Sequence, residues 1–162
     1  MKTVKNNLRR YGINPAKGRR YENITYVLAL AYNLMKARID AYLASYGLSS
    51  SEFNLLMPAA YQNEGLGLSQ VELSKRLIVS ASNITKLTDK AVKAGFIVRK
   101  TNPQSRRENI ICIAQKGRNL IDEIWPGYDK LVSGMTEKIP PADRLHAERI
   151  LNDWFNALQE DK

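Results

Sequence analysis

The sequence predicts a mainly α-helical protein with one small β-hairpin, and three patterns indicate this fold class. Runs of apolar residues with helical spacing occupy Tyr21–Tyr46, Gly117–Ile139 and the chain after Pro141. Two short helix signatures lie close together within residues 67–96. Two β-prone runs follow them, separated by a turn-rich segment. This order predicts a compact central unit with one long helix before it and two helices after it.

The central helix pair carries start and stop signals. Ser69 with Glu72 forms a capping box, in which each side chain satisfies an amide at the start of the first helix. Ser80 is the predicted N-cap of the second helix, and Gly95 stands where a C-terminal glycine belongs. Val71, Leu73 and Leu77 give the first helix an apolar side, and the spacing of Ile84, Leu87, Ala91 and Ala94 in the second helix fits one buried face.

The other face of the second helix is small, polar or cationic, and it consists of Ala81, Ser82, Asn83, Thr85, Lys86, Asp89 and Lys90. A helix that enters the major groove of DNA needs such groups near its N-terminus, because small residues allow close approach, asparagine bonds adenine and lysine reaches guanine or phosphate. The first helix would then cross the DNA backbone. This interpretation makes the pair a helix-turn-helix; the alternative is a helical hairpin with a solvated polar face. The candidate DNA-binding residues in the pair are Ser69, Gln70, Ser80, Ala81, Ser82, Asn83, Thr85, Lys86 and Lys90.

A predicted β-hairpin follows the helix pair. Ile97–Lys100 and Asn109–Ala114 are its β-prone runs, and Thr101–Arg107 between them is a turn-rich tip. A hairpin directly after a recognition helix is typical of the wing of a winged helix. Arg106 and Arg107 at this tip are then candidates to enter the minor groove, where narrow A·T tracts attract arginine. The alternative is an exposed loop with incidental charge.

The segments AGFIVRK, NPQSRR and ICIAQKGR, in this order after the helix pair, resemble the MarR family of bacterial transcriptional regulators. The resemblance covers residues 21–158 and is most specific in the middle. The wing of that family usually reads D-P-x-D-R-R, whereas here Asn102 and Ser105 replace both acids and the two arginines remain. The loss of the family's Asp–Arg pairing predicts a more mobile or more cationic wing. The threonine that caps the family's next helix is also lost, because Ala114 takes its place.

The resemblance implies a homodimer that binds a palindromic operator in double-stranded DNA as a transcriptional regulator, foremost a repressor. It also implies a small aromatic or phenolic effector that binds between the two halves and misaligns the recognition helices, with no other cofactor. A second capping box, Ser49 with Glu52, opens a helix that Pro58 interrupts, and in the family this helix lies beside the ligand cavity. Some relatives sense oxidants through a cysteine in the first helix, but the single cysteine here, Cys112, is in the second predicted wing strand.

Charge favours an anionic partner. The formal net charge is +9 and the pI is about 9.7. Residues 1–20 hold seven basic residues and no acid, and residues 68–118 hold eleven basic and three acidic residues. The segments 21–67 and 119–162 each carry more acids than bases. A positive field confined to the N-terminal arm and the predicted winged helix is typical of a nucleic-acid-binding protein. The arm is either an extra phosphate-binding tail or a solvated terminus.

Four segments follow from these patterns. They are a basic arm over 1–20, a dimerisation helix over 21–46, the winged helix-turn-helix over 47–116 and dimerisation helices over 117–162. The helix over 21–46 is apolar on more than one side, which indicates burial both within its own subunit and against a partner. The terminal helices are also apolar, and the alternative to an interface is that they cover a monomeric core. Pro126 is predicted to bend the first of them and Pro141 to start the second.

No pattern indicates an enzyme or a metal site. Cys112 and His146 are the only residues of their types, and they cannot supply the four ligands of a structural zinc. Neither a G-x-S-x-G nucleophile signature nor a phosphate-binding glycine loop is present. A lone cysteine, the lack of a signal peptide and the lack of a membrane-spanning run predict a cytoplasmic protein. Two alternatives to an effector-released repressor stay open: a DNA-binding regulator without an effector, and a winged-helix module that binds proteins instead of DNA.

Overall fold

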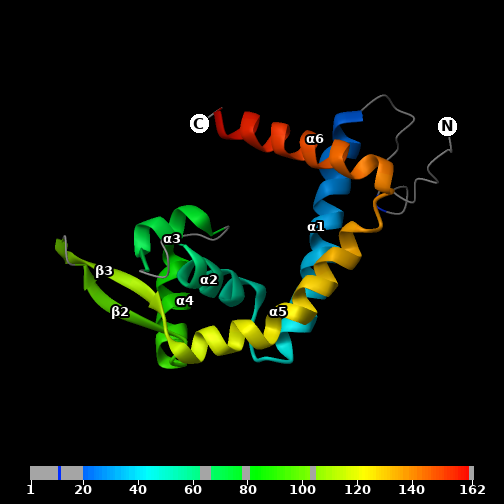
Figure 1. The fold of residues 1–162 in the computed structure, drawn as a ribbon. Coiled ribbons are helices and arrows are strands. Elements are labelled where there is room, and N and C mark those ends of the chain that lie inside the picture. The colour runs from blue at the N-terminus through cyan, green and yellow to red at the C-terminus, as the bar shows by residue number, and fades with distance from the viewer. Residues whose placement is uncertain (1–10, 12–19, 63–66, 78–80, 103–104, 161–162) are drawn as a thin grey trace.

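The computed structural model describes residues 11, 20–62, 67–77, 81–102 and 105–160, and the chain has two parts (Figure 1). One is a compact unit of α2 (Ser50–Tyr61), α3 (Gln70–Arg76), α4 (Ala81–Lys93) and a small sheet. The other consists of α1 (Arg20–Ala44), α5 (Gln115–Thr136) and α6 (Pro141–Glu160). α1, α6 and the second part of α5 extend away from the compact unit (Figure 1). The mainly α fold class is confirmed. The predicted basic arm lies almost entirely outside the described residues.

The sheet has three antiparallel strands in the order β1–β3–β2. The predicted hairpin is confirmed as β2 (Ile97–Asn102) and β3 (Ser105–Ile113), with Ile97 opposite Ile113. A third strand, β1 (Leu68–Ser69), pairs with β3 just before α3 begins. This strand was not predicted, because its pairing partners lie far along the chain.

The predicted long wing tip over Thr101–Arg107 is wrong. The ladder continues to the pair Asn102 and Ser105, and a shift in the register between Thr101 and Asn102 accommodates the extra residues of β3. Arg106 and Arg107 therefore lie in β3 and not in a turn. The cross-strand pair of Asn102 and Ser105 extends the ladder into the turn-prone segment, and residues 106–108 are the extra residues of β3 at the register shift.

The core lies where α2 meets α4, the sheet and α5. Its largest fully buried apolar side chains are Leu43, Phe53, Leu55, Leu56, Leu73, Ile84, Ile97, Ile111, Ile121 and Ile124. The apolar side of α3 is only partly covered, because Leu73 is buried but Val71 is 60% exposed. On α4 Thr88 is fully buried and Leu87 only partly so. The Thr88 hydroxyl donates to the Ile84 carbonyl oxygen at 2.7 Å, which satisfies it inside the core.

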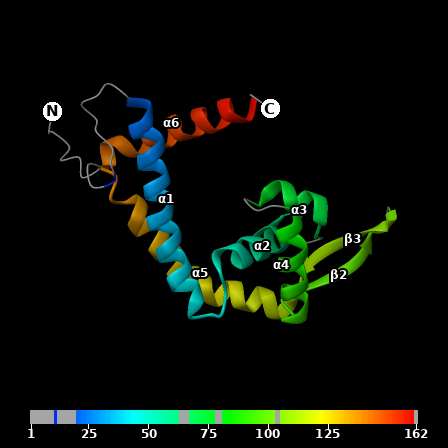
Figure 2. The same ribbon diagram turned by 180° about the vertical axis from the view of Figure 1, so that it is seen from behind.

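α1 and α5 lie side by side over part of their lengths (Figures 1 and 2). The Tyr42 hydroxyl on α1 donates to the Ile124 carbonyl oxygen at 2.8 Å, and Gly127 lies directly against the same tyrosine. α5 changes direction part-way along, as expected of a helix that contains Pro126 (Figure 1). Its N-cap is Ala114, whose side chain makes no capping hydrogen bond, so the predicted loss of the cap is confirmed.

α6 begins at Pro141, as predicted, but it packs on little of its own chain. None of its residues is buried. Its exposed large apolar residues are Leu145, Ile150, Leu151, Phe155 and Leu158. α1 likewise exposes Ile24, Val27 and Leu28 in its first half and Leu34 just beyond its middle. These helices therefore do not close over a core within one chain. No helix in the described part of the chain has the length and hydropathy needed to span a membrane.

Candidate DNA-binding surface

The predicted start of the first short helix is confirmed. The Ser69 hydroxyl accepts from the Glu72 amide at 3.2 Å, and the Ser69 amide donates to Glu72 Oε2 at 2.8 Å. These bonds to Ser69 hold the pKa of Glu72 below its usual value. Ser69 therefore has an established structural role as the N-cap of α3, beside its predicted role at the DNA.

Two of the candidate residues are in direct contact. The Gln70 side-chain amide on α3 donates to the Thr85 hydroxyl on α4 at 2.8 Å. The side chains are exposed enough for a ligand to reach them, since Gln70 is half-buried and Thr85 is exposed. This hydrogen bond joins the start of α3 to the first half of the recognition helix.

The first half of α4 presents an open polar surface. Asn83, Thr85 and Lys86 are all exposed. Ser80 lies outside the described residues, and Ala81 and Ser82 are the first two residues of the helix, with side chains that are not described. Of the candidates on this helix, Asn83, Thr85 and Lys86 are thus exposed near its N-terminus, and Asn83 and Lys86, three residues apart, lie on the same side.

The second half of α4 is held by ion pairs on two sides. Asp89 Oδ1 lies 2.5 Å from a guanidinium nitrogen of Arg99 in β2. Lys90 Nζ lies 2.7 Å from Glu52 Oε1 in α2. Sequence reasoning missed Glu52, because the capping box with Ser49 already accounted for it and no spacing rule links it to Lys90. The recognition helix is therefore open at its N-terminal end and anchored at its C-terminal end.

Sequence comparison agrees with this arrangement. Residues 48–109 match the profile of the MarR family. The match places the central segment of the chain, residues 48–109, in the MarR family. The HTH-type transcriptional repressor YetL of Bacillus subtilis is 28% identical over 120 residues, which cover 74% of this chain and 71% of YetL. The protein is accordingly a helix-turn-helix transcriptional regulator similar to those of this family.

Solved structures of this family have the same fold. Sco3205 from Streptomyces coelicolor, a MarR family transcriptional regulator solved in complex with DNA, superposes with a TM-score of 0.78 at 18% identity, covering 85% of this chain and 87% of Sco3205. BpsR from Bordetella bronchiseptica, whose DNA binding is regulated by 6-hydroxynicotinic acid, gives a TM-score of 0.72 at 18% identity, covering 81% of this chain and 91% of BpsR.

The wing consists of β2 and β3, and the ion pair between Arg99 of β2 and Asp89 attaches it to α4. Arg106 and Arg107 are in that strand, and their side chains are not described. Cys112 in β3 is buried, as predicted for a small core residue. His146 is exposed, and its Nδ1 lies 3.3 Å from a guanidinium nitrogen of Arg149. Within the described residues no group of three or more histidine, cysteine or acidic side chains is placed to hold a metal ion.

A cavity of about 470 Å³ lies between α2 and α3 of this regulator. It is lined by Asn54, Met57, Pro58, Tyr61, Gln62, Arg76 and Leu77. Pro58 has no amide hydrogen, so the Asn54 carbonyl oxygen loses its usual helical donor on the same face of α2. Arg76 donates one bond to the Glu72 carbonyl oxygen at 3.1 Å, which leaves further guanidinium hydrogens for a ligand. The cavity thus combines an apolar floor with a cation and polar acceptors.

Proposed function

We propose that this regulator is a homodimeric repressor that binds a pseudo-palindromic site in double-stranded DNA and is released by a small aromatic ligand. The observation that carries the DNA role is the exposure of Asn83, Thr85 and Lys86 near the start of a helix whose second half is held by two ion pairs. An asparagine can bond bidentately to adenine in the major groove, and lysine reaches guanine or phosphate. Arg106 and Arg107 of β3 are proposed to bind beside it, at the minor groove or the backbone.

Selection of bound sequences from a random DNA pool, followed by fluorescence anisotropy, tests this role. Asn83→Ala is expected to cost about 1–3 kcal/mol on the selected site and little on a scrambled duplex. Lys93→Ala, in the last turn of the same helix, serves as the matched control and should leave the ratio of the two affinities unchanged. Equal losses on both duplexes would make Asn83 a backbone contact.

The wing and the arm are proposed to add affinity through their charge. Arg106→Ala or Arg107→Ala is expected to lower the salt slope of binding by about 1 for each phosphate that the arginine neutralises in the wild type. Deletion of residues 1–20 should weaken binding to all sequences while leaving the selected sequence the same. An unchanged slope in the arginine variants would exclude the wing from the DNA interface.

Dimerisation is proposed through the uncovered apolar faces of α1 and α6. Burial of an apolar side chain is worth about 1.5–3 kcal/mol, so these faces provide a strong drive to associate. Analytical ultracentrifugation at micromolar concentration should show a dimer, and the half-sites of its operator should be about 10 bp apart, or a multiple of this. Phe155→Glu is expected to weaken the dimer, whereas Asn152→Glu on the same helix should not. A wild-type monomer, with DNA present, would refute the dimer.

The effector is proposed to bind in the cavity between α2 and α3. Its apolar floor suits an aromatic ring, and Arg76 suits a carboxylate. Titration with hydroxylated aromatic acids in the absence of DNA should give binding that Arg76→Ala weakens and that Lys75→Ala, its neighbour on α3, leaves unchanged. A cytoplasmic location is proposed with this role, because the operator is there.

A further inference from the structure

Glu52 is a buried carboxylate at the junction of α2 and α4. The residue is 8% exposed. Its Oε2 accepts from the Ser49 amide at 2.9 Å and from the Ser49 hydroxyl at 2.8 Å, and its Oε1 lies 2.7 Å from Lys90 Nζ. Burial alone would raise the pKa of Glu52, but Lys90 and Ser49 together hold it below the usual value. The Glu52 carboxylate thus caps α2 and also forms an ion pair with Lys90 of α4.

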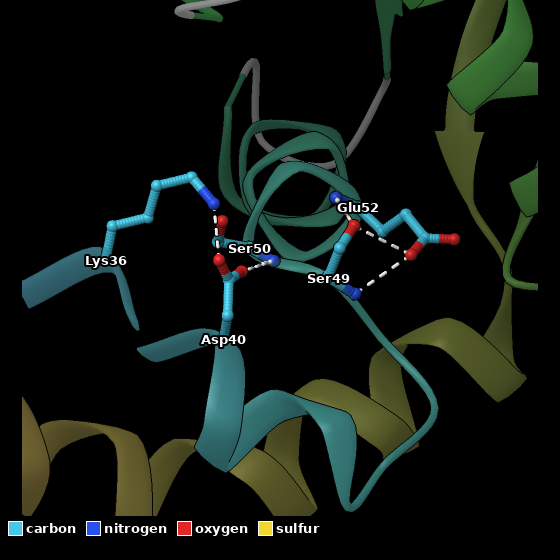
Figure 3. A network of polar contacts seen from close by, with 5 residues as sticks. All are labelled: Lys36, Asp40, Ser49, Ser50 and Glu52. Carbon is cyan, nitrogen blue, oxygen red and sulfur yellow. Dashed lines mark hydrogen bonds and ion pairs between the residues drawn. The ribbon is translucent and has the colours of Figure 1, made fainter. Parts of the chain in front are cut away.

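The same end of α2 is also held from α1. Asp40 Oδ1 accepts from the Ser50 amide at 2.9 Å, and Lys36 pairs with the same carboxylate (Figure 3). Figure 3 shows Asp40 and Glu52 at the start of one helix, with Asp40 contributed by α1. The first turn of α2 therefore connects α1 to α4 through charged hydrogen bonds.

α2 and α4 pack on each other through buried side chains such as Leu56 and Ala91, and the ion pair lies beside this contact. A hollow of about 220 Å³ lies beside the ion pair, and Leu48, Leu56, Ala91 and Phe96 are among its lining residues, with Glu52 and Lys90. Well-packed protein interiors leave few voids larger than a water molecule, and such packing is what usually sets the distance between helices. At this hollow the ion pair adds a charged connection between the two packed helices.

We propose that Glu52 is a positioning residue for DNA recognition. By holding Lys90 it sets the angle at which α4 presents Asn83, Thr85 and Lys86. This inference rests on the proposed DNA-binding function. It also assigns Lys90, a candidate DNA contact by sequence, to holding the helix. The two roles predict opposite effects when the carboxylate is neutralised: a positioning role loses specific binding, whereas a Lys90 released toward phosphate would strengthen binding to any duplex.

Glu52→Gln and Lys90→Gln, alone and together, provide the test. Glutamine can still cap the Ser49 amide, so the first variant removes the charge and keeps the capping box. Glu72→Gln is the matched control, because Glu72 closes the other capping box but has no ion pair with α4. Affinities for the selected operator and for a scrambled duplex are measured over a range of salt concentrations, and thermal unfolding is followed in parallel.

We expect each variant of the pair to lower operator affinity about tenfold, within the usual range for coupling between sites, and to leave the scrambled duplex unaffected. The double variant should lose no more than either single one, and the salt slope should not change. Glu72→Gln should leave the ratio of the two affinities unchanged. If Glu52→Gln does not fold, the affinities of Lys90→Gln for the operator and for the scrambled duplex provide the test.

The inference is overturned if Lys90→Gln weakens both duplexes and lowers the salt slope by about 1, because Lys90 is then a phosphate ligand. It is also overturned if Glu52→Gln binds the operator as tightly as the wild type or more tightly. Failure of the proposed function would look different, since the wild type itself would then not discriminate between operator and scrambled duplex.

Discussion

Gly127→Ala is expected to force α1 and α5 apart, although alanine is the better helix former. A β-carbon at this position would overlap the Tyr42 hydroxyl oxygen and lie 2.8 Å from the ring carbon that bears it. Tyr42 has little room to move, because its hydroxyl donates to the Ile124 carbonyl oxygen and lies 3.3 Å from the Tyr46 hydroxyl. The Tyr46 contact, together with burial, raises the pKa of Tyr42 to about 12.

The net cost follows from three opposing effects. Overpacking costs about 1–3 kcal/mol, loss of the Tyr42 hydrogen bond adds about 0.5–1.5 kcal/mol, and the alanine returns about 1 kcal/mol of helix propensity. Gly127→Ala is therefore expected to destabilise the protein by about 0.5–3.5 kcal/mol in urea unfolding. Gly134→Ala on the same helix meets no atom within 4 Å and should stabilise it by up to about 1 kcal/mol.

The opposite signs of these two changes are the test. In a Tyr42→Phe background, which removes the atom in closest contact, Gly127→Ala should cost less. If Gly127→Ala stabilises the protein as much as Gly134→Ala does, the tyrosine yields freely and the close approach of α1 and α5 imposes no constraint.

Three further predictions concern stability. Gly67→Ala should be destabilising by more than about 1 kcal/mol, because Gly67 has a φ of +94° and a β-carbon there would meet Cys112, Ile110 and Ile111 at 2.6 Å; thermal unfolding close to that of the wild type would refute this. Ala114→Ser should supply the missing cap of α5 and raise stability by about 1 kcal/mol in urea unfolding, unless the α5 amides already have other acceptors. Lys36 and then Ser50 lower the pKa of Asp40 to about 2, below its ordinary 3.8. The stability that this carboxylate contributes is present above its ordinary pKa and is lost as the pH falls toward 2. Asp40→Asn should therefore lose less stability than the wild type between these pH values, and parallel acid curves would contradict the assignment.

The features that could be predicted from the sequence are those that depend on residues close together in the chain. The capping boxes of α2 and α3 need only a serine and a glutamate three residues apart, and both were found where predicted. The hairpin and the long helices follow from periodicity in the same way. The exposed first half of α4 was likewise readable, because its polar face consists of neighbouring residues.

The features that were missed depend on contacts between distant segments. β1 is only two residues long, and it forms because Leu68 and Ser69 pair with Ile111 and Ile110 of β3. Glu52 and Lys90 meet only when α2 packs on α4. Val71 satisfied the apolar spacing, but a helix as short as α3 is covered on one side and buries only Leu73. Tertiary packing, which no local pattern records, decided each of these outcomes.

α6 has twenty residues, and none of them is buried. This exposure has a consequence for the dissociation of the proposed dimer. Nucleation of an isolated helix is unfavourable, and most helical stability in proteins comes from the packing of an apolar face. The conformation of α6 is therefore expected to depend on what covers its apolar side chains. Separation of two subunits would then be accompanied by fraying of the C-terminal helix, and the far-ultraviolet circular dichroism of the protein should weaken on dilution as the subunits part.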